Sequence, residues 1–496
     1  MHSKKFTQLY SRKDVLLLLI DYMRGRLQET LLAGLLTFLW LVNIPIAILA
    51  VSRFITNRSV FITSDLRRIR NDPMIIFQIT TRSATKTPVV KRGIRSIIES
   101  CRKIEYDKFK ISIITDDPTD NLELDQFDCE VVVVPKSFNT SAIKKGRALQ
   151  YALFYRKSKK ENEKQIWIYH MDDESFVTSQ TILSLLKFIR DGKGVASEGP
   201  IFYPLKFENA NVLTALAESI RPFTCYDCVS QMTNKVVIKT PPLHMHGSNL
   251  LVRSDVEDNI GWNFGPTLAE DQLFGYMVYE KYGSDSMGWH GGILLEQPPL
   301  NIKDHFMQRR RWVLGSLQNI DKFSIVHRVK LSYKLMTYFL GFAAGLLSTI
   351  ISIYVNLPIV LSFFTFADTH TGNGAASDSI VNSFIDNLNL AFQQFYSNSA
   401  LHNWTTAGPI EFATGVLLLF SSLIWLFSYQ FGLFQNLRFS QISISKKILF
   451  HFQTLFLCPI IGLVETFPAF YSIIEYIFRN NRNEGTPVYD FYVIEK

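Results

Sequence analysis

The chain has 496 residues, 47% of them hydrophobic, and a formal net charge of +8. This length exceeds what one compact domain usually needs. The basic residues form no tail or continuous patch, so we expect no nucleic-acid partner despite the positive charge. The five cysteines predict no disulfide framework, and Cys225-x-x-Cys228 is a single pair that favours reduced thiols over a zinc or redox site.

Uncharged apolar segments lie towards the two ends of the chain. Roughly 20 apolar residues suffice to cross a hydrocarbon core about 30 Å thick. The segments cover residues 30–52, 335–367, 412–437 and 448–464. We expect at least three spans and favour four. The first is predicted to be a retained anchor, since it has no small-residue cleavage pattern.

The last apolar stretch is interrupted by Pro459, Glu465 and Pro468. It could form a tilted span, a re-entrant hairpin, or a span followed by an interfacial helix. Basic residues follow the first apolar segment and precede the second, which places the middle of the chain on the cytoplasmic side. Other basic residues lie before the first segment and oppose this orientation: Lys4, Lys5, Arg12 and Lys13. The orientation of the N-terminus is therefore left open.

The polar middle of the chain alternates between apolar strands and a helical pattern. Short apolar runs at residues 74–80, 110–115, 129–134 and 166–171 are typical of buried parallel strands. Apolar residues at helical spacing fill residues 90–101, so a βαβ arrangement follows. Acidic clusters come directly after two of these strands, where open α/β sheets bind ligands.

The acidic clusters predict a metal site and a catalytic base. Three acids follow a predicted buried strand: Asp172, Asp173 and Glu174. They could hold a divalent cation, which would neutralise the diphosphate that leaves when the anomeric bond of a nucleotide sugar breaks. Asp271 is the candidate base that would remove the proton from the hydroxyl group to which the sugar is transferred. It also precedes an apolar helical face, so it could simply be an acidic residue favoured by a helix N-terminus.

Two further patterns are ambiguous taken alone. Gln308-Arg309-Arg310-Arg311-Trp312 lies just before an apolar segment, and by itself this pattern favours an interfacial anchor. His244 and His246 would point to the same face of an extended segment. A metal role is possible for them, but a structural or acceptor-lining role is favoured.

Taken in order, these motifs resemble the family 2 glycosyltransferases, in the membrane-bound branch that includes cellulose and hyaluronan synthases. Within that branch the chain is most similar to egghead-type β-1,4-mannosyltransferases. The resemblance runs from about residue 75 to residue 312 and returns at the tail. The matching segments are FQITTR (77–82), IITDDP (113–118), VVPK (133–136), KGRALQYAL (145–153), WIYHMDDES (167–175), Gly247-Ser248, Ala269-Glu270-Asp271, QRRRW (308–312) and FYVIEK (491–496).

The resemblance implies a role for each matching residue. Asp271 would be the catalytic base and Glu270 its neighbour. Asp172 and the third residue of its triplet would hold Mg²⁺ or Mn²⁺ beside the diphosphate. That third residue is Glu174 here, so the choice between Glu174 and Asp173 is open. The implied donor contacts are Arg82, Asp116 with Asp117 as the second choice, Lys145, Asp172, Gln308 and Arg311. The implied acceptor contacts are Trp312, Gly247, Ser248 and His246.

The implied fold class is α/β: a Rossmann-like, glycosyltransferase A-type cytosolic domain inserted between transmembrane helices, with interfacial helices. The predicted parts are an N-terminal membrane anchor (1–71), a glycosyltransferase domain (72–300), interfacial helices with QxxRW (301–334), a C-terminal membrane region (335–478) and a tail (479–496).

The implied activity is inverting transfer of a hexose from UDP-glucose or GDP-mannose to an acceptor at the lipid bilayer. The expected activity is processive synthesis of a cell-surface polysaccharide, a capsule or exopolysaccharide glucan, in a microbial plasma membrane, with a homo-oligomer possible. QxxRW favours it, as does the abundance of Lys, Ile, Asn and Phe, which is typical of low-GC microbial coding sequences. The alternative, which the egghead likeness suggests, is single addition of mannose from GDP-mannose to a glycolipid, and it would also fit an ER or Golgi membrane. A transporter with a cytosolic domain is a remote alternative, because Glu465 is the one acid embedded in an apolar stretch.

Overall fold

The computed structural model describes residues 38–39, 44–56, 66–83, 88–161, 165–192, 194–233, 241–369 and 409–480. The chain divides into two compact units, residues 1–46 with 343–422 and residues 47–342 with 423–496. The second unit holds every residue discussed below as part of a site. The predicted first span, 30–52, lies mostly outside the described residues, as does the tail motif at 491–496.

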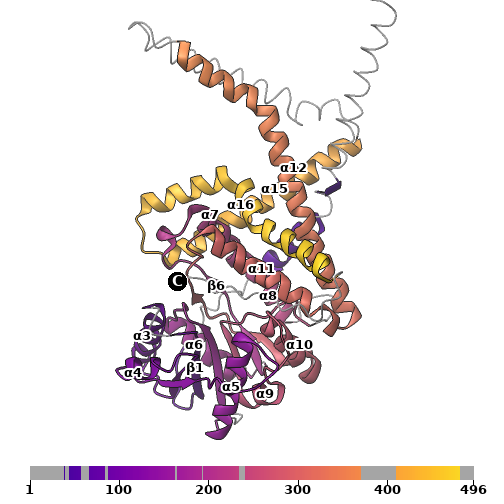
Figure 1. Cartoon of the computed structure of the whole chain (residues 1–496). Helices are drawn as coiled ribbons and strands as arrows, with labels where there is room; N and C mark the ends of the chain where they lie inside the picture. The colour runs from indigo at the N-terminus through magenta and orange to yellow at the C-terminus, as the bar shows by residue number, and fades with distance from the viewer. Residues whose placement is uncertain are drawn as a thin grey trace, which may run out of the picture. The chain divides into compact units, whose positions relative to one another are not determined.

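A seven-stranded mixed sheet, which includes the strand labelled β1 in Figure 1, forms the centre of the second unit. The strand order is β3-β2-β1-β4-β7-β5-β8. The first four strands in this order are parallel to one another, and β7 runs antiparallel to both β4 and β5. The strands are β1 (Met74–Thr80), β2 (Phe109–Thr115), β3 (Glu130–Val133), β4 (Ile166–Asp172), β5 (Ala196–Glu198), β7 (Leu250–Arg253) and β8 (Met287–Trp289). β6 (Ile201–Phe202) and β9 (Leu294–Leu295) form a separate two-stranded sheet.

The predicted βαβ arrangement is therefore confirmed, and the acidic clusters do follow β2 and β4. Helices cover both faces of the sheet because apolar side chains of β1 alternate between them: Ile75 and Phe77 face one core, and Ile76 faces the other. The first core is closed by α3 (Pro88–Lys103) and α6 (Ser179–Asp191). The second is closed by α5 (Lys144–Ser158), α8 (Arg221–Met232), α9 (Ser254–Ile260) and α10 (Glu270–Tyr282).

A buried polar network fixes α5 against the sheet. Arg156 of α5 donates to Gln78 of β1 and lies 2.5 Å from Glu257 of α9. Glu257 also accepts from the indole of Trp262 at 2.7 Å. Burial would raise the pKa of Glu257, but Arg156, followed by His170, lowers it to about 2. Removing one partner of the Arg156–Glu257 pair would leave a buried charge and lower the stability of the fold by about 3–5 kcal/mol. The pair therefore holds α5 as a whole, including its N-terminal turn, against the sheet.

The remaining elements are helices and 3-10 turns. They are α2 (Ile44–Thr56), α4 (Asp120–Leu124), the 3-10 turns η1 (Phe207–Asn209), η2 (Glu218–Ile220), η3 (Ser284–Ser286) and η4 (Ile320–Lys322), and the helices α7 (Val212–Ala217), α11 (Ile302–Gln318), α12 (Ile325–Thr369), α15 (Pro409–Phe439) and α16 (Ile444–Asn480). α16 continues through Pro459 and Pro468 as one helix, so the re-entrant hairpin was wrong.

α16 is the one helix, within the part of the chain that the structure describes, that is long and apolar enough to cross a membrane. Its residues 444–479 reach a mean hydropathy of 1.7 over an 18-residue window. This criterion rests on length and composition only. The predicted segments at 335–367 and 412–437 are helical, as parts of α12 and α15, but most of the side chains of residues 335–367 lie outside the described set.

Candidate active site

Lys145 lies where three parts of the chain meet. It stands in the first turn of α5, and its Nζ lies 2.5 Å from Asp172 Oδ1 at the end of β4. The same Nζ donates to the carbonyl oxygen of Gly247 at 2.9 Å. Burial would lower the pKa of Lys145, but Asp172, and then Glu270 and Asp271, raise it. The ammonium group is therefore the positive centre of an acidic site.

The predicted base lies beside this lysine. A Cβ placed on Gly247 would come within 2.8 Å of Asp271 Oδ2 and 3.0 Å of Lys145 Nζ, so these groups face the same backbone carbon. Asp271 is in the first turn of α10, and its Oδ1 accepts from the backbone N–H of Gln272 at 2.8 Å. The structure thus brings Lys145, Asp172, Gly247 and Asp271 together.

The carboxyl groups of Glu270 and Asp271 differ in their tendency to ionise. Burial, and then the charge of Asp271, raise the pKa of Glu270 to about 7. Burial also raises the pKa of Asp271, while Lys145 and Arg311 oppose that rise. The charge of Asp271 thus favours the protonated form of Glu270, whereas Lys145 and Arg311 favour the charged form of Asp271, which is the form that a base needs.

The acids after β2 lie at the same edge of the sheet but make separate contacts. Asp116 is exposed and lies 3.2 Å from Arg147, two residues after Lys145 on α5. Asp117 accepts from Ser83 at 3.2 Å and from the backbone N–H of Thr119 at 3.0 Å. Arg82, at the end of β1, is exposed. The N-terminal turn of α5 therefore links the two acidic clusters through Lys145 and Arg147.

Carboxylate oxygens suited to a hard divalent cation are present after β4. Asp172 and Asp173 are partly exposed, and Asp173 accepts from Thr81 at 3.2 Å. Glu174 is buried, and its charge lies near Arg92. Asp172 and Asp173 thus fit Mg²⁺ or Mn²⁺ better than Glu174 does, because a coordinating carboxylate must reach a site that a solvated ion can enter.

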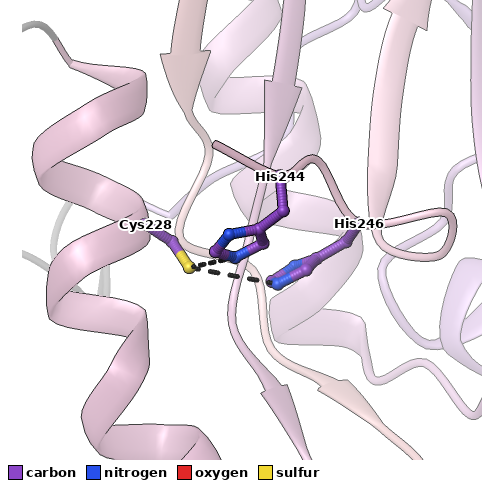
Figure 2. A group of neighbouring side chains, drawn as sticks. All are labelled: Cys228, His244 and His246. Carbon is purple, nitrogen blue, oxygen red and sulfur yellow. Dashed lines mark hydrogen bonds between the residues drawn. The ribbon is translucent and has the colours of Figure 1, made fainter. Parts of the chain in front are cut away.

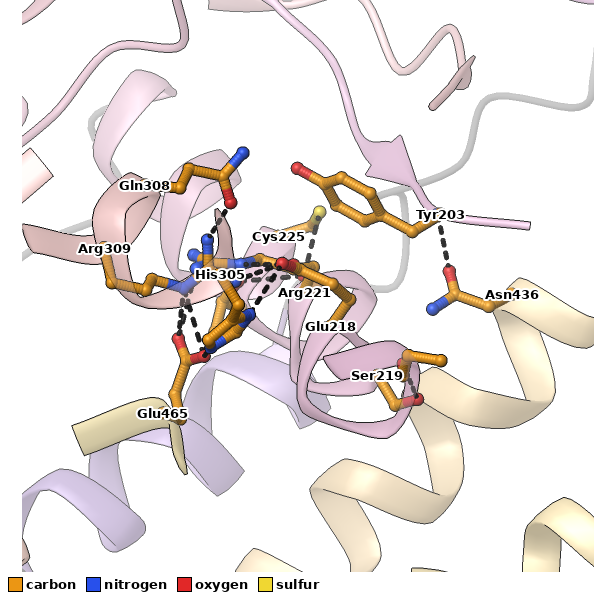
Figure 3. Close-up of polar contacts among 12 residues, drawn as sticks. Tyr203, Glu218, Ser219, Arg221, Cys225, His305, Gln308, Arg309, Asn436 and Glu465 are labelled. Carbon is orange, nitrogen blue, oxygen red and sulfur yellow. Dashed lines mark hydrogen bonds and ion pairs between the residues drawn. The ribbon is translucent and has the colours of Figure 1, made fainter. Parts of the chain in front are cut away.

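The QRRRW segment lies on α11, and two of its arginines are held by acids from distant parts of the chain. Arg309 lies 2.5 Å from Glu218 and 3.1 Å from Glu465 of α16 (Figure 3). It also donates to Gln308 at 2.7 Å. Arg310 binds Glu475 of α16, with a closest distance of 2.6 Å. These arginines are therefore structural cations that hold α16 against α11.

The other predicted residues of this segment have distinct surroundings. Arg311 is partly exposed. Burial raises the pKa of both Glu270 and Asp271, and the positive charge of Arg311 opposes that rise. The guanidinium groups of Arg221 and Arg309 lie 4.7 Å and 4.3 Å from the centroid of the Trp312 ring. Trp312 is thus oriented by two cations, each of which contributes about 0.5–2 kcal/mol to holding it.

The predicted acceptor residues 246–248 contact two acids that sequence reasoning missed. Ser248 donates to Glu296 at 2.8 Å, and the backbone N–H of His246 donates to Glu198 at 2.9 Å. Both acids are buried. His244 lies two residues before His246. Burial, and then the positive charge of Lys334, lower the pKa of His244 well below its usual range. The sequence does mark these two acids, because Glu198 and Glu296 each stand alone in an otherwise uncharged stretch, which is typical of a buried carboxylate with a specific partner.

Residues 167–368 match the family model described as glycosyl transferase family group 2. The resemblance to family 2 glycosyltransferases is confirmed by this match.

Within that class, the curated relatives are mannosyltransferases. The chain is 28% identical to β-1,4-mannosyltransferase bre-3 of Caenorhabditis elegans over 277 residues, which cover 54% of this chain and 58% of that protein. It is 27% identical to β-1,4-mannosyltransferase egh of Drosophila melanogaster, over 54% of this chain and 57% of that protein. The egghead-type likeness is confirmed, and the chain spans somewhat more than half the length of the curated relatives it matches.

Solved structures give a weaker likeness. The mannosyltransferase PcManGT from Pyrobaculum calidifontis, solved with GDP-Man and Mn²⁺, is 12% identical over 78% of this chain and 98% of its own, with a TM-score of 0.40. TarS from S. aureus, residues 1–349, is 10% identical over 85% of this chain and 100% of its own, with a TM-score of 0.27.

We expect Gly247→Ala to disturb the site without unfolding the chain. The added methyl would lie within 3.0 Å of both Asp271 and Lys145, so one of them must move. A displacement of about 1 Å can cost roughly 100-fold in rate, and we expect a loss of that order in nucleoside diphosphate release from a nucleotide sugar. Gly462→Ala is the control, because a Cβ there meets nothing within 4 Å. Equal rates for the two variants would contradict the placement.

Proposed function

We propose that this chain is an inverting, metal-dependent glycosyltransferase that moves a hexose from a nucleotide-diphosphate sugar to a membrane-associated acceptor. The observation that carries the proposal is the convergence of Lys145, Asp172 and Asp271 around Gly247. This convergence supports a site with one cation for a diphosphate and one carboxylate base for an acceptor. The family resemblance supports the same reaction class.

The chemistry follows from the charges of these residues. Asp271, ionised beside Lys145, accepts the proton of the acceptor hydroxyl as that oxygen attacks the anomeric carbon. Direct displacement inverts the anomeric configuration, so an α-linked donor gives a β-linked product. Mg²⁺ or Mn²⁺, when bound by Asp172 with Asp173 or Glu174, would neutralise charge on the leaving diphosphate. Lys145 binds and orients the same diphosphate, and Arg147 holds Asp116 in position for the donor's base.

We propose GDP-mannose as the donor and a membrane glycolipid as the acceptor, with one mannose added in each reaction. The support for this choice is that the curated relatives are named β-1,4-mannosyltransferases. UDP-glucose remains the second donor to be tested. The catalytic domain is proposed to face the cytoplasm at an integral membrane position, in line with the apolar composition of α16.

A second candidate is processive synthesis of a cell-surface polysaccharide. The observation that favours it is the QRRRW segment on α11, in which two guanidinium groups lie over the Trp312 ring and the charge of Arg311 acts on Asp271. A ring fixed in this way could stack on the terminal sugar of a growing chain. Single addition and polymer synthesis use the same catalytic residues and differ in whether the product leaves after each transfer.

Replacing the base should separate binding from chemistry. We expect Asp271→Asn to bind a nucleotide sugar with unchanged affinity and to lower transfer by about 100-fold or more, because the amide cannot accept the proton. Calorimetry measures the first quantity and nucleoside diphosphate release the second. Glu280→Gln, an exposed acid on the same helix, should behave like the unmodified chain. Substantial turnover by Asp271→Asn would remove this residue from the role.

Donor and product can be identified in one assay. The chain in detergent is incubated with UDP-glucose or GDP-mannose, Mn²⁺ and a lipid acceptor, and the released nucleotide and product mass are measured. We expect GDP release and a product heavier by one hexose. A long polymer would exclude single addition and select the processive alternative. Absence of release from every nucleotide sugar in a wider panel would contradict the enzyme assignment.

A further inference from the structure

A group of three side chains with metal-binding atoms lies outside the proposed catalytic residues. Cys228 of α8 points towards His244 and His246, which lie on the segment before β7 (Figure 2). Its Sγ lies 3.2 Å from His244 Nε2 and 4.0 Å from His246 Nε2. All three atoms lie within 4.8 Å of one another. The roles expected from the sequence, a reduced thiol for Cys228 and a structural or acceptor-lining role for the two histidines, do not explain why three such atoms converge.

The spacing fits one tetrahedral ion. Zinc binds sulfur at about 2.3 Å and imidazole nitrogen at about 2.0–2.1 Å, so a tetrahedral site separates sulfur from nitrogen by about 3.6 Å. The two observed separations, 3.2 Å and 4.0 Å, lie on either side of that value. One thiolate with two imidazoles is a ligand set that selects zinc over Mg²⁺ or Ca²⁺, which prefer oxygen.

The surroundings of His246 supply a second, independent observation. Its Nδ1 lies 3.6 Å from Oε2 of Glu198, whose side chain is completely buried. Neither His246 Nδ1 nor Glu198 Oε1 has a hydrogen-bond partner within the described part of the chain. A carboxylate behind a ligating histidine is the usual support of a zinc site, since metal on Nε2 leaves the proton on Nδ1 to face the acid. A bound cation would also balance the buried charge.

We propose that Cys228, His244 and His246 bind one zinc ion, with Glu198 supporting His246 and a water as the fourth ligand. The ion joins α8 to the segment that carries Gly247 and Ser248. It therefore fixes the backbone carbonyl that Lys145 binds, without taking part in the displacement. This inference does not depend on the sugar or on the proposed reaction.

The test measures zinc directly in the purified full chain. After dialysis against metal-free reducing buffer and addition of Zn²⁺ alone, elemental analysis should find one equivalent per chain. Cys228→Ser and His244→Gln should lose it, and Glu198→Gln should weaken the affinity by about 10–100-fold. Cys225→Ser is the matched control: it lies one turn earlier on α8, and its Sγ contacts the carbonyl of Arg221 at 3.4 Å.

Cobalt substitution gives a second readout that does not depend on activity or on folding yield. Co²⁺ should show a thiolate charge-transfer band in the unmodified chain and in Cys225→Ser, but not in Cys228→Ser. Asp172→Asn should retain zinc, because the proposed catalytic metal site is separate. Zinc content that is unchanged by Cys228→Ser and His244→Gln, or no zinc in the unmodified chain, would overturn the proposal.

Discussion

The ion pair between Lys145 and Asp172 is the contact on which the rest of the site depends. It joins the start of α5 to the end of β4, and the same ammonium group holds the Gly247 carbonyl. Without a cation at this point, the carboxyl groups of Asp172, Glu270 and Asp271 would lie together with no positive charge to balance them. Lys145 stabilises that arrangement, and it is itself kept in place because Arg156 fixes α5 to β1 and α9.

A second constraint connects this site to the C-terminal helix. Arg309 and Arg310 lie on α11, directly before Arg311 and Trp312, and are paired with Glu465 and Glu475 of α16. A buried pair of this kind adds little net stability, but it fixes the relative position of two helices. The apolar helix α16 therefore sets the position of the segment that faces the catalytic acids. Through these pairs, the position of the QRRRW segment depends on that of an apolar helix.

Much of the sheet could be predicted, because buried parallel strands are continuous apolar runs. β1, β2, β3 and β4 all appear close to their expected positions, and Asp172 and Asp271 occupy a strand end and a helix start. β5 and β8 could not be predicted, since each has three residues and Glu198 interrupts the apolar pattern. The ion pairs of α11 were also missed. Arg309 and Glu465 are 156 residues apart, and no local pattern records a contact of that range.

The most direct test of this account compares the two neighbouring lysines at the start of α5. Lys144 is exposed and Lys145 faces Asp172, so Lys144→Met and Lys145→Met remove the same charge from adjacent positions. Calorimetry with GDP-mannose and Mn²⁺ should show binding weakened by about tenfold or more in Lys145→Met, because a desolvated charge contact is worth about 1.5–3 kcal/mol. Lys144→Met should bind as the unmodified chain does. Unchanged affinity in Lys145→Met would contradict the central role given to this residue.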